Sequence, residues 1–164
     1  MNKSFLYAVG LLLLVCSAGF SQNDSDGIPL PFQDAKIGQW VKHRFYNGGI
    51  VRAEIVDISE EGEISVEMED WRDGKLLDSK THKHTADQIK ADRVTFLPGE
   101  VISIEHTVST VLGEEIPVSI VTRAFGEDYT IKIVFSREIP VYGEVLIEAS
   151  DQPYPISELI DYKK

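Results

Sequence analysis

From Ile37 onward, apolar residues alternate with polar ones, and turn residues interrupt the alternation about every ten positions. The turns, rich in Gly, Asn and Asp, lie at 47–49, 61–62, 73–74, 98–99, 113 and 126–128. Because successive side chains of a strand point to opposite faces, each segment between turns is predicted to be a strand with one buried face. The predicted strands cover residues 39–46, 50–58, 63–71, 75–82, 101–111, 117–125, 129–136 and 141–149.

These strands predict an all-β fold, a single antiparallel meander of about eight strands. A long sheet with one apolar face must cover that face, so we expect it to curve into a half-barrel, a barrel or a sandwich. One or two short helices are expected, one capped by Thr85 over residues 86–91 and one over 157–161. By alternation, the predicted inward residues include Ile64, Val66, Met68, Ile102, Ile104, His106, Val108, Leu112, Tyr129, Ile131, Ile133, Phe135, Val141, Val145 and Ile147, while Glu63, Glu67 and Glu69 face outward.

The N-terminus has the layout of a secretory signal peptide. Lys3 precedes an apolar stretch over residues 5–15, and small residues follow up to Ser21. We predict a signal peptide over 1–21 with cleavage before Gln22, and cleavage after Ala18 as the alternative. A flexible leader over 22–35 and a single β domain over 36–164 would follow. The protein is therefore predicted to be exported, to the periplasm or the extracellular space.

Cys16 is the one cysteine of the chain and lies at the end of the apolar stretch. A lipoprotein anchored through Cys16 is the less favoured alternative, because bulky Val15 stands where a small residue is needed. After cleavage no cysteine remains, so the mature protein has no disulfide, thiol nucleophile or cysteine metal site. The formal net charge of −11 repels nucleic acid and anionic lipid surfaces, so no nucleic-acid partner is expected.

The sequence contains no motif of a common catalytic class. Gly-x-Ser-x-Gly, His-Glu-x-x-His and a glycine-rich phosphate loop are all absent. We therefore predict that the protein is not an enzyme and uses no cofactor. The carboxylates at 60, 61, 63, 67, 69 and 70 are interpreted as a solvated acidic face, with weak calcium binding as the alternative.

His82 and His84 are the weak candidates for a metal site, since residues two apart in a strand share a face. A zinc centre needs three or four ligands, and Asp78 or Asp87 would have to complete it. The alternative is a solvated hairpin beside Lys80 and Lys83.

His43 and His106 fall on the apolar face of their predicted strands. Each is either a histidine whose hydrogen bonds are satisfied within the core or its rim, or a polar spot in a ligand cavity. The candidate ligand-binding residues are His43, Phe45, Ile104, His106, Tyr129, Ile133 and Phe135.

Two C-terminal motifs carry a resemblance to a known group of proteins. They are Thr130-Ile131-Lys132-Ile133-Val134-Phe135-Ser136, and Ile139-Pro140-Val141-Tyr142-Gly143 followed by a short leucine-containing tail. Together with the opening Ile37-Gly38-Gln39-Trp40, they resemble small secreted bacterial all-β proteins, which look similar to the periplasmic lipoprotein-carrier half-barrels. The resemblance implies a curved antiparallel sheet around a hydrophobic cavity. Ile139 replaces the usual Val before Pro, and residues 144–148 lack the lysine common in the group.

Three classes of function remain at this point. The first is a binding or carrier module of the cell envelope that holds an apolar small molecule or lipid on the concave face of its sheet. The second is a structural or adaptor protein that meets another envelope protein through its surface or sheet edges. The third is a hydrolase without a familiar motif. A carrier needs an open cavity, whereas an adaptor is compatible with a filled core.

Overall fold

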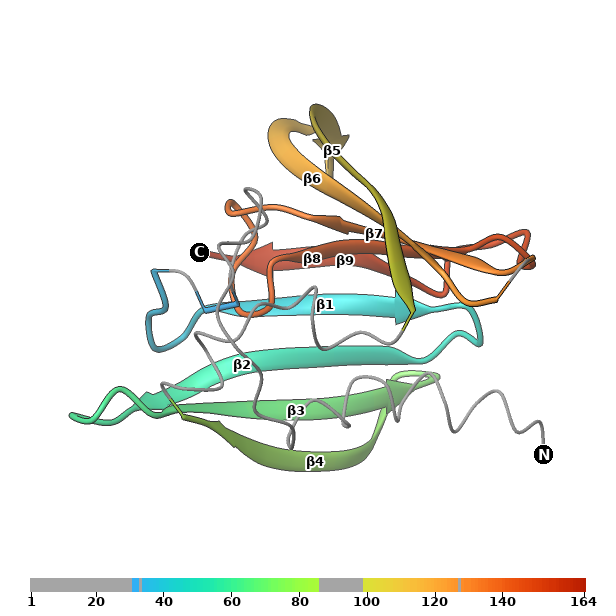
Figure 1. The fold of residues 1–164 in the computed structure, drawn as a ribbon. Coiled ribbons are helices and arrows are strands. Elements are labelled where there is room, and N and C mark those ends of the chain that lie inside the picture. The colour runs from blue at the N-terminus through green and yellow to red at the C-terminus, as the bar shows by residue number, and fades with distance from the viewer. Residues whose placement is uncertain (1–30, 33, 86–98, 127) are drawn as a thin grey trace.

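The computed structural model describes residues 31–32, 34–85, 99–126 and 128–164 (Figure 1). It confirms the all-β prediction, with one antiparallel sheet and no helix in the described residues. The nine strands are β1 (Trp40–Phe45), β2 (Ile50–Ile58), β3 (Ile64–Arg72), β4 (Lys75–His84), β5 (Glu100–Val111), β6 (Glu114–Ala124), β7 (Thr130–Phe135), β8 (Glu144–Ala149) and β9 (Ser157–Lys163). The predicted signal peptide, most of the leader and the predicted helix over 86–91 lie outside the described residues.

The strand order is β4-β3-β2-β1-β9-β8-β7-β6-β5, so the sheet consists of two meanders joined where β1 pairs with β9. The predicted helix over 157–161 is wrong, because this segment forms β9. Ser157 and Leu159 are buried and alternate with less buried residues, which is the pattern of a strand. Pairing with β1 on one side and β8 on the other outweighs any weak local preference for a helical turn.

A main core lies between the two halves of the sheet. Its buried side chains come from β1–β3, β5–β9 and the β7–β8 loop: Val41, Ala53, Ile55, Ile64, Val66, Val111, Ile116, Val118, Val134, Ile139, Val141, Val145 and Leu159, together with Phe32. Strands such as β2 and β6 are not neighbours in the sheet, so the sheet must fold back on itself to bring them into one cluster. Figure 1 shows β5 and β6 turned steeply away from β1–β4. Phe32 extends this packing into the end of the predicted leader.

A second cluster lies on the opposite face of the β5–β8 half. It consists of Val121, Ile131, Ile133 and Phe135, with Val101, Ile104, Phe125, Tyr129 and Ile147 packed against it. In β7, Ile133 belongs to this cluster and the adjacent Val134 to the main core, so both faces of the strand are buried. The expectation of one apolar and one wet face is therefore wrong for this half of the sheet.

The predicted inward row over residues 102–112 is also largely wrong. Ile102, Val108 and Leu112 are 55%, 60% and 51% exposed, and only Ile104 packs against the second cluster. β5 pairs with β6 on one side and with no other described strand, so it is an edge strand. In addition, the register shifts between Val101 and Ser103, which leaves Ile102 in a bulge.

The β7–β8 loop is built around backbone that L-residues rarely adopt. Val141 has a φ of 62° and Gly143 a φ of 68°. The N–H of Ser136 donates to the carbonyl of Gly143 at 2.8 Å, and the Ser136 hydroxyl donates to the carbonyl of Pro117 at 2.7 Å. Left-handed backbone at a β-branched residue such as Val141 is costly, and the surrounding contacts must impose it. The loop therefore fixes the start of β8.

Gly143→Ala is expected to lower the free energy of unfolding by about 1–3 kcal/mol. An added Cβ would stand 3.1 Å from the carbonyl oxygen of Ser136, on backbone that already disfavours it. Gly113→Ala is the matched control, because its φ is also positive but its Cβ would meet nothing within 4 Å. In urea unfolding, the midpoint of Gly143→Ala should lie at a lower urea concentration than the midpoint of Gly113→Ala. Equal midpoints for the two variants would contradict this account of the loop.

Candidate functional site

A small pocket opens on the main-core side of β1, at the point where the two halves of the sheet meet. Its lining residues come from β1–β3, the β7–β8 loop and β8: Val41, His43, Phe45, Val51, Ala53, Met68, Tyr142 and Glu144. Its volume is about 20 Å³. That is room for about one water molecule, whereas pockets for drug-sized ligands measure about 300–1,000 Å³. The pocket as it stands is too small for an acyl chain.

Two buried polar residues of the pocket lining, His43 and Glu144, meet a third buried polar residue, Ser157, beside the pocket. The Nδ1 atom of His43 lies 3.3 Å from the Oγ of Ser157 and 3.7 Å from the Oε1 of Glu144. Their exposed fractions are 8% for His43, 7% for Glu144 and 0% for Ser157. In a nucleophilic triad the hydroxyl and the carboxylate contact different ring nitrogens. Here both are near the same nitrogen, so the contacts position the imidazole across β1, β8 and β9.

Tyr142 links this pocket to the end of β4. Its hydroxyl lies 3.4 Å from the Nε2 of His84 and donates to the Met68 sulfur at 3.8 Å. Phe32 packs on both rings, with centroid distances of 4.7 Å to His84 and 5.4 Å to Tyr142. Within the described residues, no three His, Cys, Asp or Glu side chains gather to hold a metal ion. The ring contacts with Phe32 and Tyr142 place His84 in an aromatic cluster, while His82 is half-buried on the same strand.

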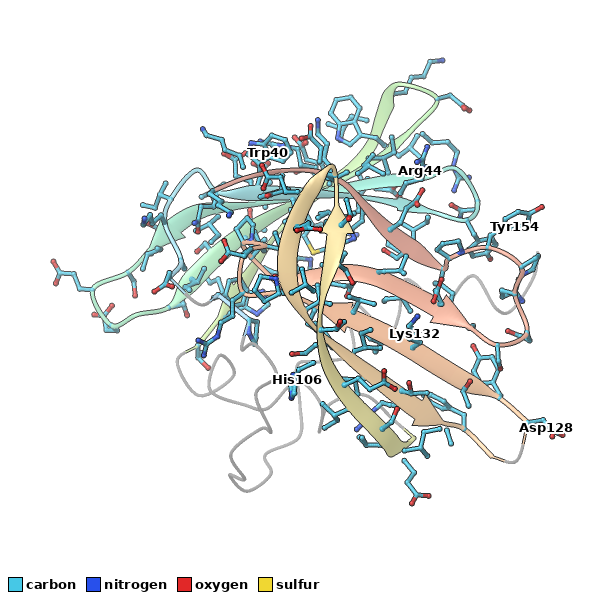
Figure 2. The ribbon with its side chains drawn as sticks, turned by 90° about the horizontal axis from the view of Figure 1, so that it is seen from above. Trp40, Arg44, His106, Asp128, Lys132 and Tyr154 are labelled. Carbon is cyan, nitrogen blue, oxygen red and sulfur yellow. The ribbon has the colours of Figure 1, made fainter. Side chains whose placement is uncertain are left out.

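Most of the predicted ligand residues lie elsewhere, in or beside the second cluster. Ile104, Tyr129, Ile133 and Phe135 come together there, on the other face of the sheet from His43 and Phe45. His106 lies one step along the same face, and its Nδ1 is 3.1 Å from the Oγ of Ser119, which pairs with Phe135. Figure 2 labels His106 on the β5–β6 hairpin.

The rim of the second cluster carries one titratable phenol. Burial raises the pKa of the Tyr129 hydroxyl, and the charge of Asp151 raises it further. Phe125 packs edge-on against the Tyr129 ring, with centroids 5.7 Å apart. Tyr129 is therefore a neutral, half-buried aromatic group at ordinary pH.

Sequence reasoning missed Glu144, Tyr142 and Ser157. The predicted inward row contains Val145 and Ile147, so alternation placed Glu144 on the outward face. In this half of the sheet both faces are buried, and Leu146, two residues after Glu144, packs against the main core. The carboxylate of Glu144 lies on that side, next to His43. The adjacent Pro140 and Gly143 signal an irregular backbone, but not the direction in which Glu144 points.

The two edges of the sheet form a second candidate surface. β4 pairs only with β3 among the described strands, and nearly all its side chains are exposed, including half-exposed Leu76 and Leu77. β5 is the opposite edge, with exposed Ile102 and Val108. An unpaired edge offers a row of backbone N–H and C=O groups to another strand.

Comparisons with protein-family models, curated proteins and solved structures find no match to this chain. None of the described segments forms an apolar helix long enough to cross a membrane.

Proposed function

We propose that the protein is a non-catalytic adaptor that binds another polypeptide along the edge of its sheet, on β5. The observation that carries this proposal is the contrast between the small pocket beside the main core and an edge strand that pairs on one side only among the described strands. The main core packs buried apolar side chains from both halves of the sheet, and the pocket beside it has a volume of only about 20 Å³. The 12-residue β5, in contrast, has no strand on its outer side among the described residues.

The composition of β5 supports this role. Natural edge strands are commonly protected by lysine or proline. β5 contains neither. Its protection consists of Glu100, Glu105 and the bulge at Ile102, and residues 103–111 beyond the bulge are rich in Val, Ile, Ser and Thr, which suits strand pairing. A partner segment that adds a strand there would gain main-chain hydrogen bonds, while Ile102 and Val108 would contact its side chains. Given the predicted export, the partner would be a polypeptide of the cell envelope.

A photo-crosslinking amino acid placed at Val108 tests the proposal in cells that make the protein. We expect adducts from Val108 and none from the same group placed at Tyr154, which is also exposed but lies in the β8–β9 loop (Figure 2). The contact at Val108 should be specific because strand pairing fixes the partner along the edge. Absence of any Val108 adduct, or equal labelling from both positions, would contradict an adaptor that acts through β5.

An apolar ligand on the other face is the second candidate. It is favoured by the half-buried Ile104 and Tyr129, which adjoin the second cluster close to the polar pair His106 and Ser119. Titration with a fluorescent fatty acid separates the two candidates. Saturable binding that is lost in Ile133→Asp would favour the ligand, and no saturable binding would favour the adaptor.

A further inference from the structure

β4 and β5, the two edges of the sheet among the described strands, carry opposite charge. β4 holds Lys75, Lys80 and Lys83 against one carboxylate, Asp78. The β5–β6 hairpin holds four exposed carboxylates, Glu100, Glu105, Glu114 and Glu115, and its one arginine, Arg123, is buried. The edges lie at opposite ends of the strand order, so within the sheet of one chain they are not neighbours.

The lysines of β4 are available to a new partner. Lys80 contacts Asp78 at 2.6 Å and Lys83 contacts Glu63 at 2.7 Å, and both lysines are exposed. Ion pairs in water contribute little to stability, because solvent screens them and ordering long side chains costs entropy. Exchanging these partners for carboxylates of a second chain therefore costs little free energy.

The charges on the two edges match in spacing and in face. Lys75 and Lys80 are separated by the same interval as Glu100 and Glu105. Each strand also contains one bulge within that interval. As a result Lys75 pairs with Arg72, and Lys80 pairs with Met68. Arg72 and Met68 lie on one face of β3, so the two lysines lie on that face of β4. Glu100 and Glu105 likewise pair with Ala124 and Ile120, on one face of β6.

Alignment of the two edges also joins apolar residues. With Lys80 opposite Glu100 and Lys75 opposite Glu105, Leu76 lies opposite Ile104. Because the intervals are equal, the two lysines can lie opposite the two glutamates whether the two strands pair antiparallel or parallel. Leu76, which is half-exposed on a free edge, would then gain an apolar neighbour.

We infer that copies of this chain associate head to tail, with β4 of one copy pairing with β5 of the next. This inference rests on the proposed function and names a second copy as the partner. Such an interface is heterologous, because each copy contributes a different edge. It leaves one free β4 and one free β5 at the ends, so it extends into a ring or an open chain of copies.

Charge reversal on each edge tests the inference in the purified protein by sedimentation velocity. The wild type should form larger species as its concentration rises. Lys75→Glu/Lys80→Glu should remain monomeric, and so should Glu100→Lys/Glu105→Lys, since like charges then face each other across the interface. Lys36→Glu/Lys163→Glu changes the net charge as much as the β4 reversal does, at exposed positions off both edges, and should associate like the wild type.

An equimolar mixture of the two reversed variants should regain association, because every β4 then meets a β5 of opposite charge on the other variant. This rescue also shows that both variants are folded. A monomeric wild type at high micromolar concentration, or a mixture that stays monomeric, would overturn the inference. A Val108 adduct containing a different protein, with a monomeric wild type, would overturn it and leave the adaptor proposal standing, whereas no adduct at all would overturn the adaptor proposal itself.

Discussion

Phe135→Ala is expected to lower the free energy of unfolding by about 3–5 kcal/mol, the usual range for truncating a buried phenylalanine. Phe135 is only 1% exposed and packs with Val121, Ile131 and Ile133 in the second cluster. Removing the ring leaves a cavity that these β-branched neighbours are poorly placed to refill. A single domain is stable by about 5–15 kcal/mol, so a large part of the total would be lost.

Val108→Ala is the control for this truncation. Val108 lies on β5, two strands away from β7, and is 60% exposed, so the change should stay within about 0.5 kcal/mol. Urea unfolding of both variants measures the difference. If Phe135→Ala lowered the free energy of unfolding as little as Val108→Ala does, the second cluster would be loosely packed. That result would favour a ligand on this face.

His43→Leu is expected to lower the free energy of unfolding by about 3–5 kcal/mol, because it leaves the carboxylate of Glu144 buried without the imidazole beside it. The double variant His43→Leu/Glu144→Leu should recover most of that loss, since two apolar residues of similar size can replace a buried polar pair. Unfolding of the wild type, both single variants and the double variant gives the coupling energy. Additive losses would show that His43 and Glu144 do not depend on each other.

The alternation of apolar and polar residues predicted the strands well where the apolar positions of the sequence are also the buried positions of the structure. On the main-core face β2 buries Ala53 and Ile55, and β3 buries Ile64 and Val66, as the alternation over 50–58 and 63–71 predicts, although Ser65 between them is buried as well. β9 was missed because seven residues are too few for their period to stand out from a helical turn. Its strand conformation comes from β1 and β8, which are distant in sequence.

The candidate sites depended more strongly on features that sequence does not show. β5 has the same alternation as a central strand, but its position at the edge leaves Val108 in solvent. His43 was correctly suspected of lying on an apolar face, yet its partner Glu144 was placed outward, because alternation does not show that both faces of β8 are buried. The opposite charges of β4 and β5 were present in the sequence. Only the strand order shows that they belong to the two free edges.

The pairing of β1 with β9 has a kinetic consequence. These strands lie side by side in the middle of the sheet, yet contacts such as that of Arg44 with Glu158 join residues 114 positions apart. Closing so long a loop is entropically costly, and folds with many distant contacts assemble slowly. Until β1 and β9 pair, each meander is left with a temporary inner edge, on β1 or β9. During that interval a newly made chain would be most prone to aggregate, and a chaperone that holds it would help most.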